Sequence, residues 1–494
     1  MKYKWNGRTV IPKATKTLLF GYSFDSKIMP GQIPDGVETI VVGRLYNQEF
    51  DENVIPENLV KLVLGSSYTK KLDFNMFPNL LSLDLFHGYN HDLMQVDLPK
   101  NLVDLQISFI YDYEIFGDML PKSIKNMGLG YYYTYPFNSK TFPSGLEKLQ
   151  ISHEYTHRIH RDFFPETLTD LDLGGKYNKL IKAASLPKNL VTLTLSYKYN
   201  HPLSAEHFPD SLEHLILGGD FSQPILENSL PRNLKILGIN RGCRNPIKSE
   251  YFPESVIEVY FTGLTRYPIK GEFLPVNLER LELFCSYDNS EFGQLPNSLR
   301  FLNLGNNFRH ELKKYDIPGG VTNLTIDRCV DNDIFPEKLE HLNFDCVRYF
   351  PIKKNTLPQT IKSLILGGNY DCPICDDSLP DSIEYLEIGH YFCSEIEIQY
   401  LPSNLKYVKV STAIQMNLFV GKSQLLYFSI ISANLDDIIC IDYMVLCSED
   451  GLIHEDYEII GDTFIDNQKY YKVINPDTFQ PRSNAKSAAL YGKK

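Results

Sequence analysis

The chain lacks the features that mark membrane and secreted proteins. It contains no run of 18 apolar residues, so no membrane-spanning helix is expected. Its first residues, Met1 to Asn6, have no apolar core and do not resemble a signal peptide. Residues 12–424 contain no Ser/Gly-rich linker or low-complexity stretch. We therefore expect no domain boundary within that range.

Cysteine is absent from residues 1–242, and basic residues are fewer than acidic ones, 49 against 61. All nine cysteines lie between Cys243 and Cys447, although residues 12–242 carry the same sequence pattern without any. Disulfides are therefore not needed for the fold, and reduced thiols in the cytoplasm are expected. The formal net charge is −12. An acidic chain is a poor match for a nucleic-acid backbone or an anionic membrane, so we expect neither as a partner.

Proline, by contrast, recurs at a nearly constant interval. The spacing is 22 residues, with two gaps of 21 and one of 18. Taken as position 0 of each unit, the prolines are Pro12, Pro34, Pro56, Pro78, Pro99, Pro121, Pro143, Pro165, Pro187, Pro209, Pro231, Pro253, Pro275, Pro296, Pro318, Pro336, Pro358, Pro380 and Pro402. Self-similarity at such a period is typical of a solenoid or another repeat array.

Each unit carries apolar residues at fixed positions after the proline. They fall at +3, +6 and +8, as in Leu168, Leu171 and Leu173, with an aromatic residue frequent at +12 and an aliphatic one at +16. The step from +6 to +8 is strand alternation, and no unit has the long helical periodicity of an α-helix. One unit cannot bury these residues alone, but stacked units can. The pattern predicts a β-rich solenoid, a curved parallel coil with one strand per turn, about 19 repeats of 22 residues and little helix. Glycine at +9, as in Gly174, is expected to end the strand at a sharp turn.

The consensus Leu-Pro-x-x-Leu-x-x-Leu-x-Leu-Gly, followed by Tyr/Phe-Asn-x-Pro-Ile, resembles the FNIP repeat. The best matches to the second part are residues 199–203, 221–225 and 350–352. The FNIP repeat is a 22-residue variant of the leucine-rich repeat, abundant in slime moulds and in giant DNA viruses of amoebae. The resemblance covers residues 11–430 and implies a leucine-rich-repeat-like solenoid with protein binding as the default role. Many members carry an F-box before the repeats, but only residues 1–11 precede the first proline here, so none is expected.

The repeat pattern also suggests a domain organisation. Residues 1–11 are expected to form an N-terminal cap, residues 12–431 the solenoid, and residues 432–494 a C-terminal cap or a small β module with a frayed tail. Strands are expected at residues 438–445, 457–464 and 468–474, with Asp466-Asn467 as a hairpin turn. The unit from Pro318 to Pro336 is four residues short. Val321, Leu324 and Ile326 keep its strand, so we expect the shortening to fall in the return segment and to change the curvature locally.

Three motifs resemble catalytic or cofactor sites, and none fits its surroundings. His153-Glu154-Tyr155-Thr156-His157 matches the zincin pattern, with His160 behind it, but that chemistry needs a helix and Tyr155 is the +12 core residue. Cys372-Pro373-Ile374-Cys375 resembles a redox or zinc-ribbon motif, but its Pro-Ile belongs to the repeat and only Cys393 follows nearby. Gly421-Lys422-Ser423 ends like a phosphate-binding loop, but Met416 replaces the required first glycine. We therefore predict no catalytic residue, cofactor or metal.

The exposed face of the strands is the predicted binding surface. Residues at +5 and +7 must point away from the core because side chains alternate along a strand. They include Lys61, Val63, Asp104, Gln106, Lys148, Gln150, Asp170, Asp172, Thr192, Thr194, His214, Ile216, Glu258, Tyr260, Arg280, Glu282, His341, Asn343, Tyr385, Glu387, Tyr407 and Lys409. Variable side chains on a fixed scaffold are typical of recognition surfaces. The predicted partner-binding residues are His214, Tyr260, Arg280, Glu282, His341, Tyr385, Glu387 and Tyr407.

These observations favour a non-enzymatic scaffold for protein–protein interaction, with a protein partner that the sequence does not identify. A location in the cytoplasm is expected, which would be the host cell cytoplasm if the chain is viral. The alternative is a substrate-recognition adaptor in ubiquitin transfer, in which a separate F-box protein supplies the contact to the ligase.

Overall fold

The computed structural model describes residues 2–182, 185–240, 247–264, 270–286, 293–305, 308, 312–327, 334–344, 351–368, 370–375, 377–389, 391–394, 396–410, 419–420, 425–431, 440–446, 458–465 and 468–474. From residue 410 onwards the description covers the backbone alone. The chain forms two compact units, unit 1 (Met1–Tyr267) and unit 2 (Pro268–Lys494), which we describe separately.

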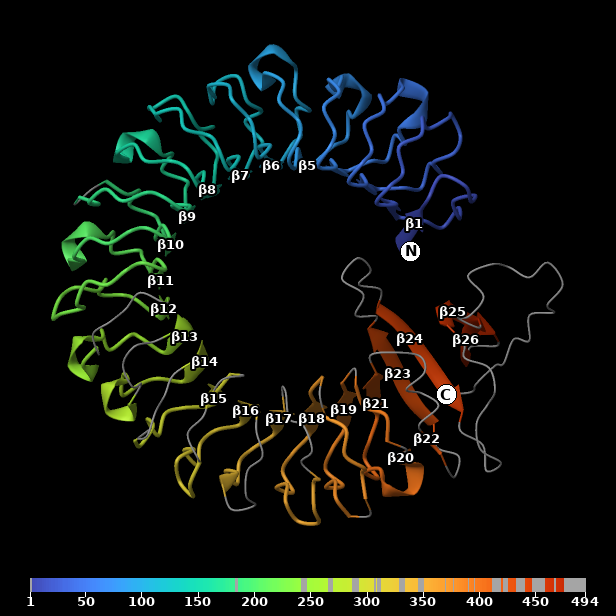
Figure 1. The fold of residues 1–494 in the computed structure, drawn as a ribbon, viewed down its shortest axis with the longest axis vertical. Helices are drawn as coiled ribbons and strands as arrows, with labels where there is room; N and C mark the ends of the chain where they lie inside the picture. The colour runs from blue at the N-terminus through green and yellow to red at the C-terminus, as the bar shows by residue number, and fades with distance from the viewer. Residues whose placement is uncertain are drawn as a thin grey trace. The chain divides into compact units, whose positions relative to one another are not determined.

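Unit 1 is a parallel β-solenoid in which each turn contributes one short strand. Its strands are β1 (Lys2–Trp5), β2 (Thr17–Phe20), β3 (Thr39–Val41), β4 (Lys61–Val63), β5 (Ser82–Asp84), β6 (Asp104–Gln106), β7 (Asn126–Gly128), β8 (Lys148–Gln150), β9 (Asp170–Asp172), β10 (Thr192–Thr194), β11 (His214–Ile216), β12 (Ile236–Ile239) and β13 (Glu258–Leu264). Consecutive strands pair in register, so that Thr192 lies between Asp170 and His214. Within unit 1 the strands line the concave side of an arc (Figure 1).

The return segments of unit 1 carry single turns of 3-10 helix on the outer side. They are η1 (Glu52–Val54), η2 (Phe74–Met76), η3 (Leu93–Gln95), η4 (Arg161–Phe163), η5 (Ala205–His207) and η6 (Ser249–Tyr251). No α-helix occurs in the part of the chain that the structure describes. The described residues therefore offer no helix with the length and apolar character that a membrane span requires.

Unit 2 continues the same strand pattern. Its strands are β14 (Arg280–Ser286), β15 (Phe301–Asn303), β16 (Asn323–Ile326), β17 (His341–Phe344), β18 (Ser363–Leu366), β19 (Tyr385–Ile388), β20 (Ile396–Glu397), β21 (Tyr407–Val410), β22 (Phe419–Val420), β23 (Leu425–Ile431), β24 (Cys440–Leu446), β25 (Glu458–Ile465) and β26 (Gln468–Ile474), with 3-10 turns η7 (Gly271–Phe273) and η9 (Ile398–Tyr400). The pairing is parallel from β14 through β19, β21 and β23, after which β23 pairs antiparallel with β24 and β25 with β26. The predicted fold class, a parallel solenoid with almost no helix, is confirmed.

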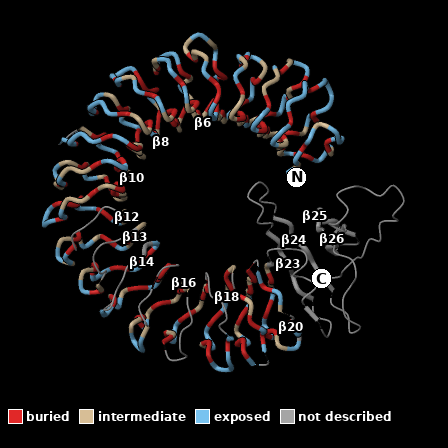
Figure 2. Tube along the Cα trace, viewed as in Figure 1, coloured by how far each residue is buried: buried red, intermediate tan, exposed pale blue. Residues whose placement is uncertain are grey.

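The core consists of the residues at the repeated apolar positions. In the turn that carries β10, Leu190 (+3), Leu193 (+6) and Leu195 (+8) are at most 2% exposed, and so is Tyr199 (+12). In the turns of unit 1, Figure 2 shows buried residues along the inner part and most of the exposed residues towards the outer loops. Because each turn covers the apolar face of the next, the core is continuous along a unit without a central cluster.

The aromatic residue at +12 satisfies a backbone group of the preceding turn as well as filling space. The hydroxyl oxygen of Tyr155 accepts a hydrogen bond from the N–H of Phe137 at 3.2 Å, and Tyr133 does the same for Ile115 at 3.2 Å. Tyr111 and Tyr89 continue this tyrosine ladder. A buried N–H that would otherwise lack a partner is thus paired, which explains why tyrosine recurs at this position as well as phenylalanine.

Polar side chains at two other positions also tie each turn to the next. At +13, the Oδ1 atom of Asn178 accepts the N–H of Asn200, whose own Oδ1 accepts the N–H of Ser222 at 2.9 Å. At +2, the hydroxyl of Ser211 donates to the carbonyl oxygens of Lys188 and Leu190. These contacts give a physical reason for the asparagine of the repeat and for the Ser, Thr or Asn that follows its proline.

One unit departs from the predicted numbering. Lys61 pairs with Ser82, only 21 residues away, and the N–H of Leu80 bonds to the carbonyl of Phe77 as the +3 N–H of other units bonds to proline. Phe77 therefore holds position 0 there, and the assignment of Pro78 to it was wrong. The spacing of the buried leucines sets the register, and proline is only one residue that tolerates the corner. Numbering from Phe77 places Asp84 at +7.

Two different constraints favour glycine at +9. Gly174 has φ +68°, the left-handed conformation expected at a sharp turn. Gly65 has no positive φ, but a Cβ there would lie 2.1 Å from the carbonyl oxygen of Gly43 in the previous turn. Close approach of backbones, rather than dihedral freedom, therefore excludes larger residues at Gly65.

In the short unit the strand is intact, since β16 pairs in register with both β15 and β17. Residues 328–333 of its return segment lie outside the described residues, so the predicted change of curvature remains a prediction. In the C-terminal region, β24, β25 and β26 correspond to the three expected strands. The expected hairpin turn at residues 466–467 and the tail from Pro476 onwards also lie outside the described residues.

Candidate partner-binding surface

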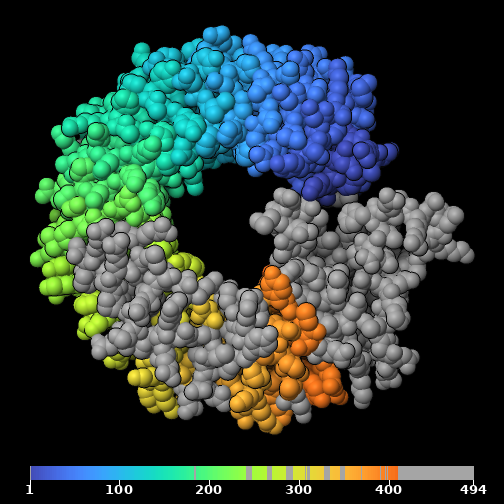
Figure 3. Space-filling model, viewed as in Figure 1, coloured from blue at the N-terminus to red at the C-terminus, as the bar shows by residue number. Residues whose placement is uncertain are grey.

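The residues at +5 and +7, which we call the strand face, form a trough in unit 1. Its volume is about 440 Å³, and strands β4 to β10 line it. The lining on the strand face consists of Lys61, Ser82, Asp84, Asp104, Gln106, Asn126, Gly128, Lys148, Gln150, Asp170, Asp172, Thr192 and Thr194. Figure 3 shows the concave side of this arc edge-on in space-filling form. Apart from Gly128, these outward residues carry polar side chains, in which amide and hydroxyl groups are interspersed with charges.

Two aspartates at +7 have the same local geometry. The Oδ1 atom of Asp84 accepts the N–H of Phe86 at 2.8 Å, and that of Asp172 accepts the N–H of Gly174 at 2.8 Å. Burial raises the pKa of both carboxyl groups, although these N–H bonds oppose the shift, as does the charge of Lys61 near Asp84. Each carboxylate is thus held in one orientation and is less well hydrated than an ordinary surface aspartate.

The charged groups at +5 are paired more closely. Lys148 Nζ lies 3.8 Å from Asp170 Oδ1, and the hydroxyl of Thr169 donates to Asp170 Oδ2 at 2.7 Å. The amide of Asn126 donates to Asp104 Oδ1. Along the edge of the strand face, exposed lysine–glutamate pairs one turn apart neutralise each other: Lys16–Glu38, Lys125–Glu147 and Glu213–Lys235. Such exposed pairs contribute little stability, about 0–1 kcal/mol each.

The predicted residues of unit 1 lie on this strand face, at one end of the trough. His214 on β11 has Nδ1 3.4 Å from the hydroxyl of Thr192, which lines the trough. Tyr260 on β13 lies over Gly238, where a Cβ would be 2.4 Å from the tyrosine Cζ. Gly238 therefore provides the space that the ring of Tyr260 occupies.

In unit 2, three predicted residues come together on β19 and β21. The rings of Tyr385 and Tyr407 stack at 5.2 Å with an interplanar angle of 10°. The hydroxyl of Tyr385 donates to Glu387 at 2.8 Å, and Lys409 Nζ lies 2.9 Å from the same carboxylate. Burial, and then the charge of Glu387, raise the pKa of Tyr385. The four side chains form one fixed cluster of aromatic and charged groups.

The other predicted residues of unit 2 are separate from that cluster. Arg280 and Glu282 on β14 form an ion pair, with Nε 2.6 Å from Oε1, and the Arg280 guanidinium carbon lies 3.6 Å from the centre of the Phe301 ring. His341 is exposed at the start of β17, between Asn323 and its neighbour on β18. All eight predicted residues lie on the strand face, while their role in binding stays a prediction.

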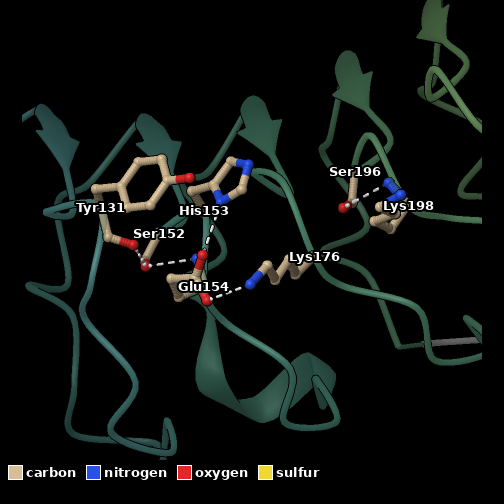
Figure 4. A network of polar contacts seen from close by, with 7 residues as sticks. All are labelled: Tyr131, Ser152, His153, Glu154, Lys176, Ser196 and Lys198. Carbon is tan, nitrogen blue, oxygen red and sulfur yellow. Dashed lines mark hydrogen bonds and ion pairs between the residues drawn. The ribbon is translucent and has the colours of Figure 1, made fainter.

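The zincin-like motif does not form a helix. Residues 153–157 lie in the turn after β8, where the ring of His153 stacks on Tyr131 at 4.2 Å and its Nδ1 lies 3.2 Å from Glu154 (Figure 4). Lys176 bonds to the same carboxylate at 2.7 Å and holds the pKa of Glu154 below its usual value. The two histidines thus do not project from one helical face as a zincin requires. In the described part of the chain, no three His, Cys, Asp or Glu side chains are grouped to hold a metal ion.

The rest of this network is turn chemistry that the repeat reproduces. The hydroxyl of Ser152 donates to the carbonyl of Tyr131 and accepts the N–H of Glu154 (Figure 4). Two repeats further along the chain, the hydroxyl of Ser196 accepts the N–H of Lys198 in the same way. These serines occupy +9, the position of glycine in other units. We therefore interpret the network as stabilising the turns of the solenoid.

The cysteine motif also falls in a return segment. Cys372 is buried, Cys375 and Cys393 are exposed, and none of the three forms a disulfide. No helix precedes or follows the motif within residues 351–389 as far as they are described, so the helix N-terminus of a thioredoxin-like site is not formed. The Gly421-Lys422-Ser423 segment lies outside the described residues.

Several residues of the trough were not among the predicted binding residues. Asp84 and Ser82 were missed because Pro78 was taken as position 0. Asn126 and Gly128 occupy +5 and +7 of the unit that begins at Pro121 and were not among the predicted residues. Asp104, Asp170 and Asp172 were assigned to the exposed face but not chosen. All of these residues are found when each strand is numbered from its buried apolar residue at +6, because the residues on either side of it are +5 and +7.

The repeats of this chain match a known protein family. A model of the FNIP Repeat matches residues 8–43, 46–85, 111–154, 155–198, 199–242, 221–264, 351–391 and 373–412, which is more than half of the chain. The chain belongs to the FNIP repeat family. The resemblance derived from the sequence is thereby confirmed.

Several solved structures resemble this FNIP protein. CroV588, a circular LRR protein, has a TM-score of 0.47 and 23% identity over 81% of this chain and 70% of its own. A chain of the Toll–Spatzle complex of Drosophila has a TM-score of 0.39 and 13% identity over 80% and 77%. A chain of the TLR13–ssRNA13 complex has a TM-score of 0.39 and 17% identity, over 76% of this chain and 61% of its own. None of the curated proteins compared with the chain matches it significantly.

Proposed function

We propose that this FNIP protein is a non-enzymatic scaffold that binds a protein partner through the strand face of its solenoid. The observation that carries the proposal is the contrast between the two sides of the strands. Inward positions such as Leu171, Leu193 and Leu215 are aliphatic and buried in turn after turn. Outward positions change from turn to turn among charged, amide, hydroxyl and aromatic side chains. A constant interior beneath a varied surface supports recognition, because specificity can be built without altering the fold.

Two features of the strand face support protein binding in particular. The trough of unit 1 is concave and rich in hydrogen-bonding groups, and the Tyr385–Tyr407 cluster of unit 2 offers stacked aromatic rings beside a charged pair. Tyrosine is enriched among the residues that dominate binding energy at protein interfaces. Such clusters are also rigid, so little side-chain entropy is lost when a partner binds.

Affinity capture from cell lysate tests the proposal. The wild type is compared with a strand-face variant, Y260A/Y385A/Y407A, and with a control variant, Y22A/Y315A/Y391A. The three control tyrosines are 55%, 79% and 62% exposed and lie in turns and return segments outside the strands. We expect a protein that the wild type and the control retain and the strand-face variant loses. Fluorescence of Trp5, which is buried and the only tryptophan, together with circular dichroism, verifies that both variants fold.

A partner that is retained equally by these three proteins and by D84N/D172N, which changes the trough of unit 1, would refute the strand-face proposal and would indicate a binding surface in the outer loops or the C-terminal region. We also propose a cytoplasmic location, or the host cell cytoplasm if the chain is viral, supported by Cys372, Cys375 and Cys393, none of which forms a disulfide. The adaptor role in ubiquitin transfer stays a prediction from the family resemblance.

A further inference from the structure

Five consecutive strands of unit 1 place a symmetric series of side chains at +7. From β5 to β9 these are Asp84, Gln106, Gly128, Gln150 and Asp172. With neighbouring strands ~4.8 Å apart, the two carboxylates lie four steps, or about 19 Å, from each other. In the middle, the side chain of Gln106 lies over Gly128, because a Cβ there would be 1.9 Å from its Oε1. The trough thus carries the Gln106 amide over its centre, the Gln150 amide beside it and one carboxylate at each end.

Neither Asp84 nor Asp172 forms a close ion pair among the described residues, although the charge of Lys61 acts on Asp84 from a longer distance. No lysine, arginine or histidine nitrogen of the described residues lies within 4.0 Å of either, whereas Asp170 has Lys148. One oxygen of each carboxylate accepts a backbone N–H, and the only other hydrogen bond that the described residues make to either is a long one from Gln150 to Asp172 at 3.5 Å. Burial raises the pKa of both groups, so holding them ionised at neutral pH opposes folding.

The local turn does not require this charge. In unit 2, Asn303 occupies the same +7 position, and its Oδ1 accepts the N–H of Gly305 at 2.9 Å. Gly305 has φ +64°, close to the +68° of Gly174 after Asp172. A neutral amide therefore builds the same turn without an ionised group. The fold therefore does not explain why positions 84 and 172 carry a negative charge.

Charge and shape together define the ligand. The trough contains four aspartates and two lysines, so it attracts a cationic partner, and its concave shape strengthens that attraction. Its strands β4 to β10 are three residues long, so the face is only about 10 Å wide. This width suits an extended chain better than an α-helix, whose diameter with side chains is about 10–12 Å. An extended segment advances ~3.3 Å per residue, so six residues span about 20 Å, and residues i and i+6 point to the same side.

We propose that the trough binds an extended basic protein segment that crosses strands β5 to β9, with lysine or arginine side chains six residues apart paired to Asp84 and Asp172. Gln106 and Gln150 hydrogen-bond to the backbone between the two basic residues. The assignment rests on the proposed function, since it names the partner chemistry for part of the same strand face.

Fluorescence anisotropy with the full-length protein tests this assignment. The probe is a fluorescein-labelled Ser/Gly peptide with lysines at i and i+6 and blocked ends. Peptides of equal composition with the lysines at i+2 or i+10 are compared with it. The protein variants are D84N/D172N and the control E52Q/E206Q, which removes two exposed carboxylates from η1 and η5. Since Asn303 builds the same turn, D84N/D172N is expected to fold and to be at least as stable as the wild type at neutral pH.

The expected result is preferential binding of the i+6 peptide, weakened about tenfold or more in D84N/D172N and unchanged in E52Q/E206Q. Equal binding of all spacings, or equal binding by D84N/D172N, would overturn the proposal. Self-association of the wild type that D84N/D172N abolishes would assign the trough to a second copy and also overturn it. If the peptides fail while Y260A/Y385A/Y407A still loses a captured protein, only the ligand assignment is wrong. If that variant and D84N/D172N both retain the protein as well, the proposed function is wrong.

Discussion

The tyrosine ladder gives the sharpest test of how the turns are held together. Tyr155→Phe keeps the ring, which stacks on Phe137 at 4.0 Å, and removes only the hydroxyl that accepts the Phe137 N–H. That N–H would be left buried without a partner, which costs about 1–3 kcal/mol. Tyr46 is the matched control, because its hydroxyl is buried and has no hydrogen-bond partner among the described residues. Tyr46→Phe should therefore be neutral or slightly stabilising.

Hydrogen exchange measured by mass spectrometry distinguishes the two variants at the level of single turns. In Y155F, the protection of the peptide containing Phe137 should fall by roughly 5- to 150-fold, the equivalent of about 1–3 kcal/mol at tenfold per 1.4 kcal/mol. In Y46F, the preceding turn should keep its protection. Equal losses in the two variants would mean that the hydroxyl acts through packing or hydration, and the hydrogen-bond account of the ladder would then be refuted.

Three further predictions concern pH, the core and the turns. Burial raises the pKa of Tyr177 and Tyr199 to about 12 from 10.0, so the stability that they contribute is complete below pH 10 and is lost as the pH rises towards 12. The unfolding free energy and tyrosinate absorbance against pH measure this loss. Leu193→Ala, at a fully buried position, should cost about 2–5 kcal/mol in urea unfolding, while Thr192→Ala beside it should change stability by less than about 0.5 kcal/mol. Phe86→Gly should raise the melting temperature, because φ +46° costs a non-glycine residue about 1–2 kcal/mol and glycine loses only about 0.5–1 kcal/mol in entropy. A lower melting temperature would show that the ring contributes more by packing than its conformation costs.

Most of the fold follows from the sequence because the repeat presents the same physical problem many times. Leucines at +3, +6 and +8 and the aromatic residue at +12 predict which side chains are buried, and Leu190, Leu193, Leu195 and Tyr199 are buried. The failure at Pro78 has a physical cause. The residue at position 0 lies at a bend of the chain, and its carbonyl oxygen accepts the N–H of the residue at +3. Phe77 can do both. Proline marks the corner in most units but does not cause it.

The hydrogen-bond ladders could not be predicted from residue spacing. They require that atoms one turn apart come within about 3 Å, and this depends on the pitch of the coil. The same holds for the glycines at +9. Gly174 and Gly65 look alike in the sequence, yet one has a left-handed φ and the other is limited by the carbonyl of Gly43.

The candidate site was predicted as a surface but not as a set of residues. Alternation along the strands places +5 and +7 outside, which is enough to define the face. Most of the predicted binding residues lie in unit 2, because exposed tyrosines are easily recognised in a sequence and two of the three are there. The series Asp84, Gln106, Gly128, Gln150 and Asp172 stands out only when the strands are aligned, since its members are 22 residues apart and each is ordinary by itself.

The repeat itself shows which surface residues the fold does not explain. At +7, Asn303 builds the same turn as Asp172 without a charge, so the scaffold needs only an oxygen acceptor there. An ionised group whose pKa is raised by burial makes the folded state less stable at neutral pH than an amide would. The charge therefore opposes folding and adds nothing to the turn, and this holds equally for Asp84, four strands away. Two such charges at opposite ends of one trough are better explained by a ligand that pairs with both than by the stability of either turn.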